Sequence, residues 1–381
     1  MFHSNGRAVL LLLWVVLAPL SSLQAQIPME RVLSRITIPA QGDLRGLVDT
    51  VGFAHRAEQM DFVVQKAEEL EKEAILKNQK KFGLTEDSRF IFGICPHDDY
   101  MLAGRTYVHI QRYIHAKTVI LLGNAHWSET FKIRNRFIFG DFKEWRGPYG
   151  PIPISSLRAE ILKELPENDY TVNRTVVATE HSLEALVPFL QHYNRNVEIV
   201  PILVPFTEWR RMDRLADDLA GAVARVLKRH GLKLGEDVAI LCSTDGQHYG
   251  DYGWSYYNYH PFGCTPDGYK KAMALDEELV TRYLTGPATT ERVHKLFGRL
   301  IDEKNISNYR ITWCGRFSVT MATDFAIHLT EKMQHRRLQG VFLRHSSSIH
   351  DRWLPLWKLG MGITGDTNLH HFVTYIAVGF K

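Results

Sequence analysis

The chain has 381 residues and nearly balanced charge, with 46 Lys and Arg against 42 Asp and Glu and a formal net charge of +4. No run of basic residues is dense enough to form a nucleic-acid groove, so we expect no nucleic-acid partner. Four cysteines are too few for a disulfide framework in a chain of this length. The length suits one large α/β domain or two smaller domains.

Residues 1–25 have the layout of a secretory signal peptide. Arg7 precedes an apolar run over residues 8–17, which is too short to span a bilayer and is followed by small residues up to Ala25. We therefore expect cleavage after Ala25 and export to the periplasm or the extracellular space. The alternative is a retained N-terminal anchor, because Leu23 is not a small residue. No other stretch is apolar enough to cross a membrane, so we expect no stable span after cleavage.

Residues 26–381 alternate helical and strand-like patterns, which predicts a single α/β domain. A strand, a helix and a second strand follow one another between residues 90 and 122, as in a parallel crossover unit. We expect helices at 55–80, 105–115, 155–165, 179–193, 208–229, 269–284, 291–301 and 314–334, and strands at 90–95, 118–122, 197–204, 238–242, 341–344 and 372–378.

Polar side chains follow four of the predicted strands at the point where each strand ends. These strands lead into His97, His126, the pair Asp245 and His248, and His345. If the strands are parallel neighbours, their carboxyl ends meet along one edge of the sheet, where open α/β sheets bind ligands. The sequence therefore predicts one polar, histidine-rich site at this edge.

The chemistry of this predicted site suits a transition-metal ion. His97, His126, Asp245, His248 and Cys314 together offer imidazole, carboxylate and thiolate groups. Imidazole and carboxylate suit non-haem Fe(II), whereas a thiolate shifts the preference toward Cu or Zn. No C-x-x-C pair is present, which disfavours a structural zinc site.

Several alternatives remain open at this point. A histidine after a strand is commonly a loop residue bonded to backbone, and Asp98 and Asp99 fit a solvated turn or a helix cap. Cys314, at a helix N-terminus, could have a lowered pKa and act as the nucleophile of a cysteine-dependent hydrolase or transferase. A third alternative is a non-catalytic module that binds a ligand or a protein. The four cysteines could also form two disulfides in any of three pairings, although Cys242 suits a small core residue.

Seven short motifs, taken in order, resemble those of the Memo family, also called AmmeMemoRadiSam system protein B. The clearest are P-H-D-D-Y at 96–100 for the family's P-H-A-G-Y, G-N-A-H at 123–126 for G-P-S-H, E-H-S-L-E at 180–184 for E-H-S-I-E, S-T-D-G-Q-H-Y-G at 243–250 for S-S-D-F-S-H-Y-G, and C-G-R at 314–316. Weaker matches are G-P-Y-G at 147–150 for T-P-L-G and the strand V-P-I-L-V at 200–204.

The resemblance implies a fold similar to class III extradiol ring-cleaving dioxygenases, with a central mixed, largely parallel sheet flanked by helices on both faces. His97, His126 and Cys314 match the family's metal-ligand positions, which implies one transition-metal ion, Fe²⁺ or Cu, with Zn as an alternative. Asp245, His248 and His181 are the expected catalytic or positioning groups.

The leading hypothesis is dioxygenase-like, O₂-dependent or redox chemistry on a small molecule, with a phenol as one candidate; the sequence does not identify the substrate. An oxidoreductase is thus the expected enzyme class, although adaptor-like family members also imply a possible protein partner. Ring-cleaving relatives use two histidines and a glutamate at Fe(II), so the thiolate of Cys314 departs from their ligand set. Asp98 and Asp99 also depart from the family pattern, because they replace its Ala-Gly, and Trp127 stands where many members carry a second histidine.

Overall fold

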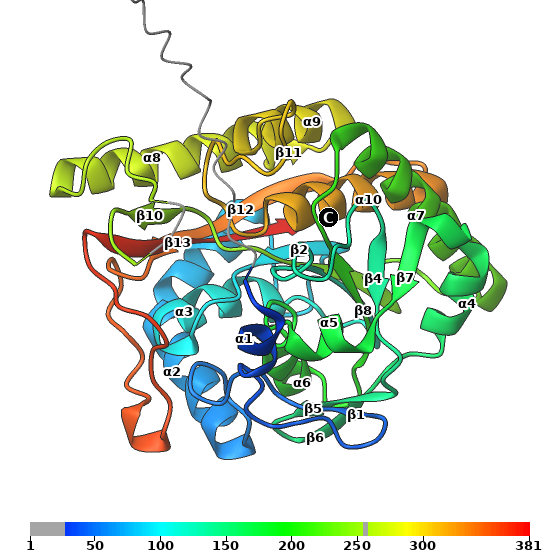
Figure 1. Cartoon of the computed structure of the whole chain (residues 1–381), viewed down its shortest axis with the longest axis horizontal. Helices are drawn as coiled ribbons and strands as arrows, with labels where there is room; N and C mark the ends of the chain where they lie inside the picture. Colours follow the sequence, from blue (N-terminus) through cyan, green and yellow to red (C-terminus); the bar gives the residue numbers. More distant parts are fainter. Residues whose placement is uncertain (1–26, 254–257) are drawn as a thin grey trace, which may run out of the picture.

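A large mixed β-sheet forms the centre of the protein and helices pack on both of its faces (Figure 1). This computed structural model describes residues 27–253 and 258–381. The predicted signal peptide, residues 1–25, lies outside the described residues. The predicted mixed sheet with helices on both faces is confirmed.

The sheet has ten strands among the described residues, and its four central strands are parallel. The order is β11 (Gly286–Pro287), β12 (Gln339–Ser347), β13 (His371–Phe380), β2 (Phe92–Cys95), β9 (Val238–Ser243), β3 (Thr118–Asn124), β8 (Glu198–Val204), β4 (Phe137–Phe139) and β7 (Tyr170–Val172), with β10 (His248–Gly250) paired to β13. Strands β2, β9, β3 and β8 all run in one direction, so their carboxyl ends reach the same edge. Strand β13 runs antiparallel to β2.

Alternate side chains of the central strands feed two separate hydrophobic cores, as a period of two requires. In β3, Val119 and Leu121 pack on one face, whereas Ile120 and Leu122 pack on the other. The first core is covered by α2 (Ala57–Phe82), α3 (Tyr100–Gln111) and α6 (Val187–Tyr193), and the second by α4 (Leu157–Glu164), α7 (Trp209–His230), α8 (Pro266–Tyr283), α9 (Thr290–Leu300) and α10 (Arg316–Gln334).

The remaining short elements lie in the connections between these layers. They are the helices α1 (Met29–Leu33) and α5 (Arg174–Thr179), the 3₁₀ turns η1 (Glu167–Asp169) and η2 (Trp357–Leu359), and a three-stranded sheet of β1 (Leu44–Arg45), β5 (Glu144–Gly147) and β6 (Gly150–Pro153).

Helix α7 illustrates how sequence pattern sets the packing. Its buried side chains recur every three or four residues, and they include Met212, Leu215, Leu219 and Val226. The helix ends at Gly231, whose φ of +64° suits a left-handed C-terminal cap. No helix among residues 27–253 and 258–381 has the length and hydropathy required to traverse a lipid bilayer.

Three expected elements differ from the structure. The helix predicted at 179–193 begins only at Val187, as α6, and a separate short helix, α5, ends at Thr179. Pro188 lies in the first turn of α6, where its missing N–H leaves no hydrogen bond unmade, whereas the middle of a helix disfavours proline. The helix expected at 105–115 begins earlier, at Tyr100. The third difference concerns the strand that contains His345.

Strand β12 is not a parallel neighbour of β2, since β13 lies between them. His345 lies inside β12, with its Nε2 3.9 Å from Asp276 Oδ2, and is absent from the cavity described below. The expectation that His345 belongs to the strand-end site is therefore wrong.

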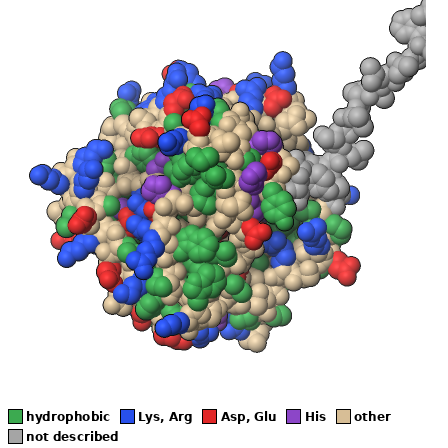
Figure 2. Space-filling model, turned by 90° about the vertical axis from the view of Figure 1, so that its left-hand side faces the viewer, with side chains coloured by type: hydrophobic (Ala, Val, Ile, Leu, Met, Phe, Trp, Pro, Cys, Tyr) green, Lys and Arg blue, Asp and Glu red, His purple; other side chains and the backbone are tan. Residues whose placement is uncertain are grey.

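On the face drawn in Figure 2, basic and acidic side chains are interspersed with hydrophobic and histidine side chains.

Candidate metal centre

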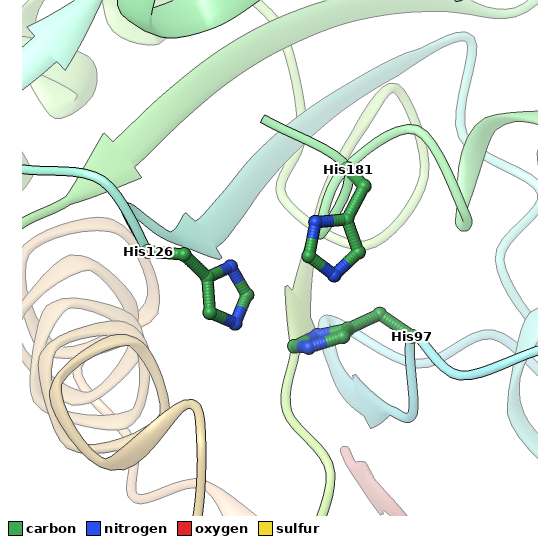
Figure 3. A group of neighbouring side chains, drawn as sticks. All are labelled: His97, His126 and His181. Carbon is green, nitrogen blue, oxygen red and sulfur yellow. The ribbon is translucent and has the colours of Figure 1, made fainter. Parts of the chain in front are cut away.

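Three histidines converge at the carboxyl edge of the central strands. His97 follows β2, His126 follows β3, and His181 lies in the break between α5 and α6. Each offers a ring nitrogen that lies within 4.8 Å of the other two. The rings of His126 and His181 stack with centroids 4.6 Å apart, and His97 stands edge-on to both (Figure 3). The three imidazoles thus surround a common space.

A buried glutamate fixes the orientation of His126. The main-chain N–H of His126 donates to Glu180 Oε2 at 2.8 Å, and its Nδ1 lies 2.8 Å from Glu180 Oε1. Burial acts to raise the pKa of Glu180, but His126 outweighs it, so the carboxyl pKa lies well below its usual range. A carboxylate that holds Nδ1 leaves Nε2 free to ligate a metal.

A second group of potential ligands shares His97. Cys314 Sγ lies 3.2 Å from His97 Nε2, and Asp245 Oδ2 lies 3.4 Å from the same nitrogen. Cys314 lies two residues before the start of α10, whereas Asp245 follows β9. Ser243 Oγ lies 2.6 Å from His97 Nδ1, on the opposite side of the ring. His97 therefore presents Nε2 to Cys314 and Asp245.

The three-histidine group opens into a cavity of about 710 Å³. Arg31 and Arg35, both exposed, line one part of it, and Asp98 and Asp99 line another. Asp99 is only 3% exposed. A molecule in this cavity would therefore meet guanidinium and carboxyl groups as well as the imidazoles.

Comparison with known proteins gives the family. The family model described as Memo-like protein matches residues 62–352. The chain belongs to the Memo family. It is similar to MEMO1 family proteins from Aquifex aeolicus (34% identical over 159 residues, 41% of this chain and 53% of the relative), Pyrobaculum aerophilum (28% over 165 residues, 41% and 53%) and Pyrococcus furiosus (26% over 187 residues, 47% and 58%). The chain spans about half the length of the curated relatives it matches.

The structure of this Memo protein gathers all six sequence-predicted site residues in one region. His97 belongs to both candidate groups, whereas His126 and Cys314, the other expected ligands, belong to different groups. His181 and Asp245, expected as catalytic or positioning groups, instead lie among the candidate ligands. His248, the sixth residue, lines the cavity, and its Nε2 is 4.0 Å from Asp245 Oδ2.

Burial keeps three imidazoles of this Memo site, those of His97, His181 and His248, neutral at neutral pH. Burial, assisted by neighbouring histidines, lowers the pKa of His97 and of His248 to about 3. The same causes place the pKa of His181 well below its usual range. Neutral imidazoles have lone pairs available for an ion, so the ring nitrogens suit a metal without prior loss of a proton.

The acidic partners of these imidazoles are shifted the other way. Burial raises the pKa of Asp245 to about 7. It also raises the pKa of the Cys314 thiol well above its usual value, with the charge of Asp245 acting in the same direction. The lowered pKa expected of a cysteine at a helix N-terminus is therefore wrong in the ion-free protein, because burial outweighs the helix. The hypothesis that Cys314 acts as a nucleophilic thiolate therefore loses its main support.

Burial decides between the two alternatives for Asp98 and Asp99, since Asp99 stands at the N-cap of α3 but neither carboxyl is solvated. Asp98 and Asp99 are not a solvated turn: Tyr375 Oη donates to Asp98 Oδ2 at 2.6 Å, and the Thr364 N–H donates to Asp99 Oδ2 at 2.5 Å. Burial raises the pKa of Asp98 to about 7 and that of Asp99 to about 8.

The cysteines form no disulfide, since all four are free, and Cys242 is buried as expected of a core residue.

Glu180 is the functional residue that reasoning from the sequence did not identify. It stands directly before His181 in the E-H-S-L-E motif, which carried the resemblance to the family but gave Glu180 no role. Its position after α5, where a helix was expected, concealed its approach to His126.

Proposed function

We propose that this Memo protein binds one redox-capable transition-metal ion, Fe²⁺ or Cu, through His97, His126 and Cys314. The observation that carries the proposal is the position of His97 Nε2, which faces a thiol at 3.2 Å while its ring stands edge-on to His126. Imidazole nitrogens together with a thiol are a donor set that suits these ions, with Zn as the alternative. His97 belongs to both groups of candidate ligands, one with His126 and the other with Cys314, and this supports a site built from the three residues.

The neighbouring residues would control this centre. Glu180 orients His126, and Ser243 contacts the Nδ1 of His97. Asp245, whose pKa burial raises to about 7, is matched to accept a proton from a substrate at neutral pH. His248 is a weaker base, since its pKa is about 3, and we assign it a positioning role.

We further propose that the substrate is a small polar molecule, with a phenol as the first class to test. The cavity of about 710 Å³ is adequate for one small molecule and is lined by groups of both charges. A bound redox-capable ion would supply O₂-dependent or one-electron chemistry in this cavity. The residues of the cavity would bind and orient the phenol, accept its proton at Asp245 and restrict the access of water.

The test of the metal site is elemental analysis of protein purified without chelator. We expect about one ion per chain in the wild type and loss of the ion in His97→Ala and Cys314→Ala. The matched control is His371→Ala, a histidine that lines the cavity but belongs to neither candidate group. A stoichiometric ion that survives both ligand substitutions would reject the site.

The test of the activity is O₂ consumption with a panel of catechols and related phenols. Asp245→Asn should lower the turnover of the phenol. The metal content of the same samples is measured, so that loss of the ion is distinguished from loss of the base. Protein that keeps its ion but turns over no phenol, and instead retains a bound ligand or protein, would favour the non-catalytic alternative over the enzyme.

Export remains a proposal that rests on residues 1–25. N-terminal sequencing of the mature protein and cell fractionation test it. A mature chain beginning after Ala25 is expected, whereas a chain that retains residues 8–17 in the membrane fraction would indicate an anchor.

A further inference from the structure

A second cluster of potential metal ligands lies between α7 and α10, which pack side by side over one face of the sheet (Figure 1). Asp213 comes from α7, and Asp324 and His328 come from α10, one helical turn apart. Each offers one atom within 4.8 Å of the others. None of the three lines the cavity of the Memo site.

The distances in this cluster suit an ion better than direct hydrogen bonds. His328 Nε2 lies 3.5 Å from Asp213 Oδ1 and 3.7 Å from Asp324 Oδ2. Bonds of about 2.0–2.2 Å to a tetrahedral ion separate neighbouring ligand atoms by about 3.4 Å. The two distances from His328 Nε2 are therefore close to the separation of neighbouring ligand atoms around a bound ion.

Asp324 provides an independent indication of a missing partner. Its side chain is fully buried, and Oδ1 accepts a hydrogen bond from Thr290 Oγ1 at 2.6 Å. Oδ2, by contrast, accepts no hydrogen bond from an N–H or hydroxyl donor of the described residues and lies 3.7 Å from His328 Nε2. A buried carboxylate oxygen without a partner is costly, and a cation between Asp324, Asp213 and His328 would remove that cost.

The orientation of His328 agrees with a ligand role. Its Nδ1 lies 3.5 Å from Asp217 Oδ1, and that oxygen also accepts from Lys332 Nζ at 2.7 Å. Nε2 is consequently directed toward Asp213 and Asp324. A carboxylate beside one ring nitrogen, with the other nitrogen on the ion, is the usual arrangement of metal-bound histidine.

We propose that Asp213, Asp324 and His328 form a second site, which binds one divalent transition-metal ion of the Zn²⁺ type. Two carboxylates and one imidazole provide three ligands, and water completes the shell from the side of Asp213, whose side chain is 47% exposed. Because the ligands come from both helices, the ion joins α7 to α10. The site contains no sulfur, which distinguishes it from the His97 and Cys314 centre.

The experiment is equilibrium dialysis of the full chain against Co²⁺ and Zn²⁺, with absorption spectra of the Co²⁺ form. We expect His328→Gln and Asp213→Asn each to lose one ion per chain relative to the wild type. Both positions are partly exposed, whereas Asp324→Asn would alter a buried position and disturb folding. The control is Glu331→Gln, an exposed carboxylate of α10 outside the cluster, which should keep the ion.

A second pair of variants distinguishes the two proposed metal sites. His97→Ala should remove the Co²⁺ band that arises from the Cys314 thiolate and leave the ion at the α7–α10 site. His328→Gln should do the reverse. Equal ion content in the wild type, His328→Gln and Asp213→Asn would overturn the proposal, and would indicate that Asp213 and Asp324 share a proton instead. Loss of the thiolate band in His328→Gln would equally overturn the independence of the second site.

Discussion

Glu180 holds His126 at two points, through the main-chain N–H and through Nδ1, each at 2.8 Å. The same carboxylate accepts the Ser182 N–H at 2.9 Å, which fixes the turn that carries His181. One buried glutamate thus positions two of the three imidazoles in Figure 3.

Glu180→Gln should therefore weaken metal binding without removing a ligand. Loss of such a supporting carboxylate lowers metal affinity by about 10–100-fold, because the histidine is less basic and its ring less restrained. Competition with a chromophoric chelator measures the change. Glu167→Gln, at an exposed glutamate that does not line the cavity, should bind metal as the wild type does. Unchanged affinity in Glu180→Gln would contradict a role in orienting His126.

Metal binding should strengthen as pH rises from 6 to 8. Burial holds the pKa of the Cys314 thiol well above its usual value, so the ion-free protein carries a thiol proton that an ion must displace. His97 adds no pH dependence in this range, since burial lowers its pKa to about 3. Calorimetry in buffers of different ionisation enthalpy should count one proton fewer released by Cys314→Ala than by the wild type. An equal proton count in both proteins would exclude Cys314 as a ligand.

The Asp98 and Asp99 pair should make the ion-free protein less stable as pH rises. Burial raises their carboxyl pKa values to about 7 and about 8, above the ordinary value of 3.8, so the folded state holds protons that the unfolded state has released. The free energy of unfolding then falls between about pH 4 and pH 8, by on the order of 1 kcal/mol per pH unit for each proton. Urea unfolding in chelator at pH 5 and pH 8 measures this slope. It should be smaller in Asp98→Asn and unchanged in Asp87→Asn, an exposed control; a slope unaltered by Asp98→Asn would contradict the assignment.

Arg45→Leu should destabilise the wall of the cavity. Arg45 Nη1 and Glu184 Oε2 form a buried ion pair at 2.5 Å, and Glu184 also accepts the N–H groups of Val48 and Asp49. Removing the arginine leaves a buried carboxylate without its charge partner, at a cost of about 3–5 kcal/mol in unfolding free energy. Chemical denaturation measures the loss. The double variant Arg45→Leu/Glu184→Leu should be less destabilised than the single variant, and the opposite order would show that the ion pair is not the cause.

Much of the fold followed from local patterns in the chain. Apolar runs ending at breakers predicted β2, β3, β8 and β9, and helical periodicity predicted α2, α7 and α10. Because these strands are parallel neighbours, the residues after them meet at one edge, which is why His97, His126 and Asp245 could be expected together.

The tertiary structure alone decided which groups are buried and which atoms face one another. Adjacent aspartates at 98 and 99 have the sequence pattern of a solvated turn, and only the covering segment at Thr364 buries Asp99. The α7–α10 cluster was not expected, because Asp213 and Asp324 are far apart in the chain and become neighbours only when the two helices pack. The spacing of residues along the chain predicts contacts within one helix or strand. The burial and the pKa of a side chain depend also on helices, strands and loops from other parts of the chain.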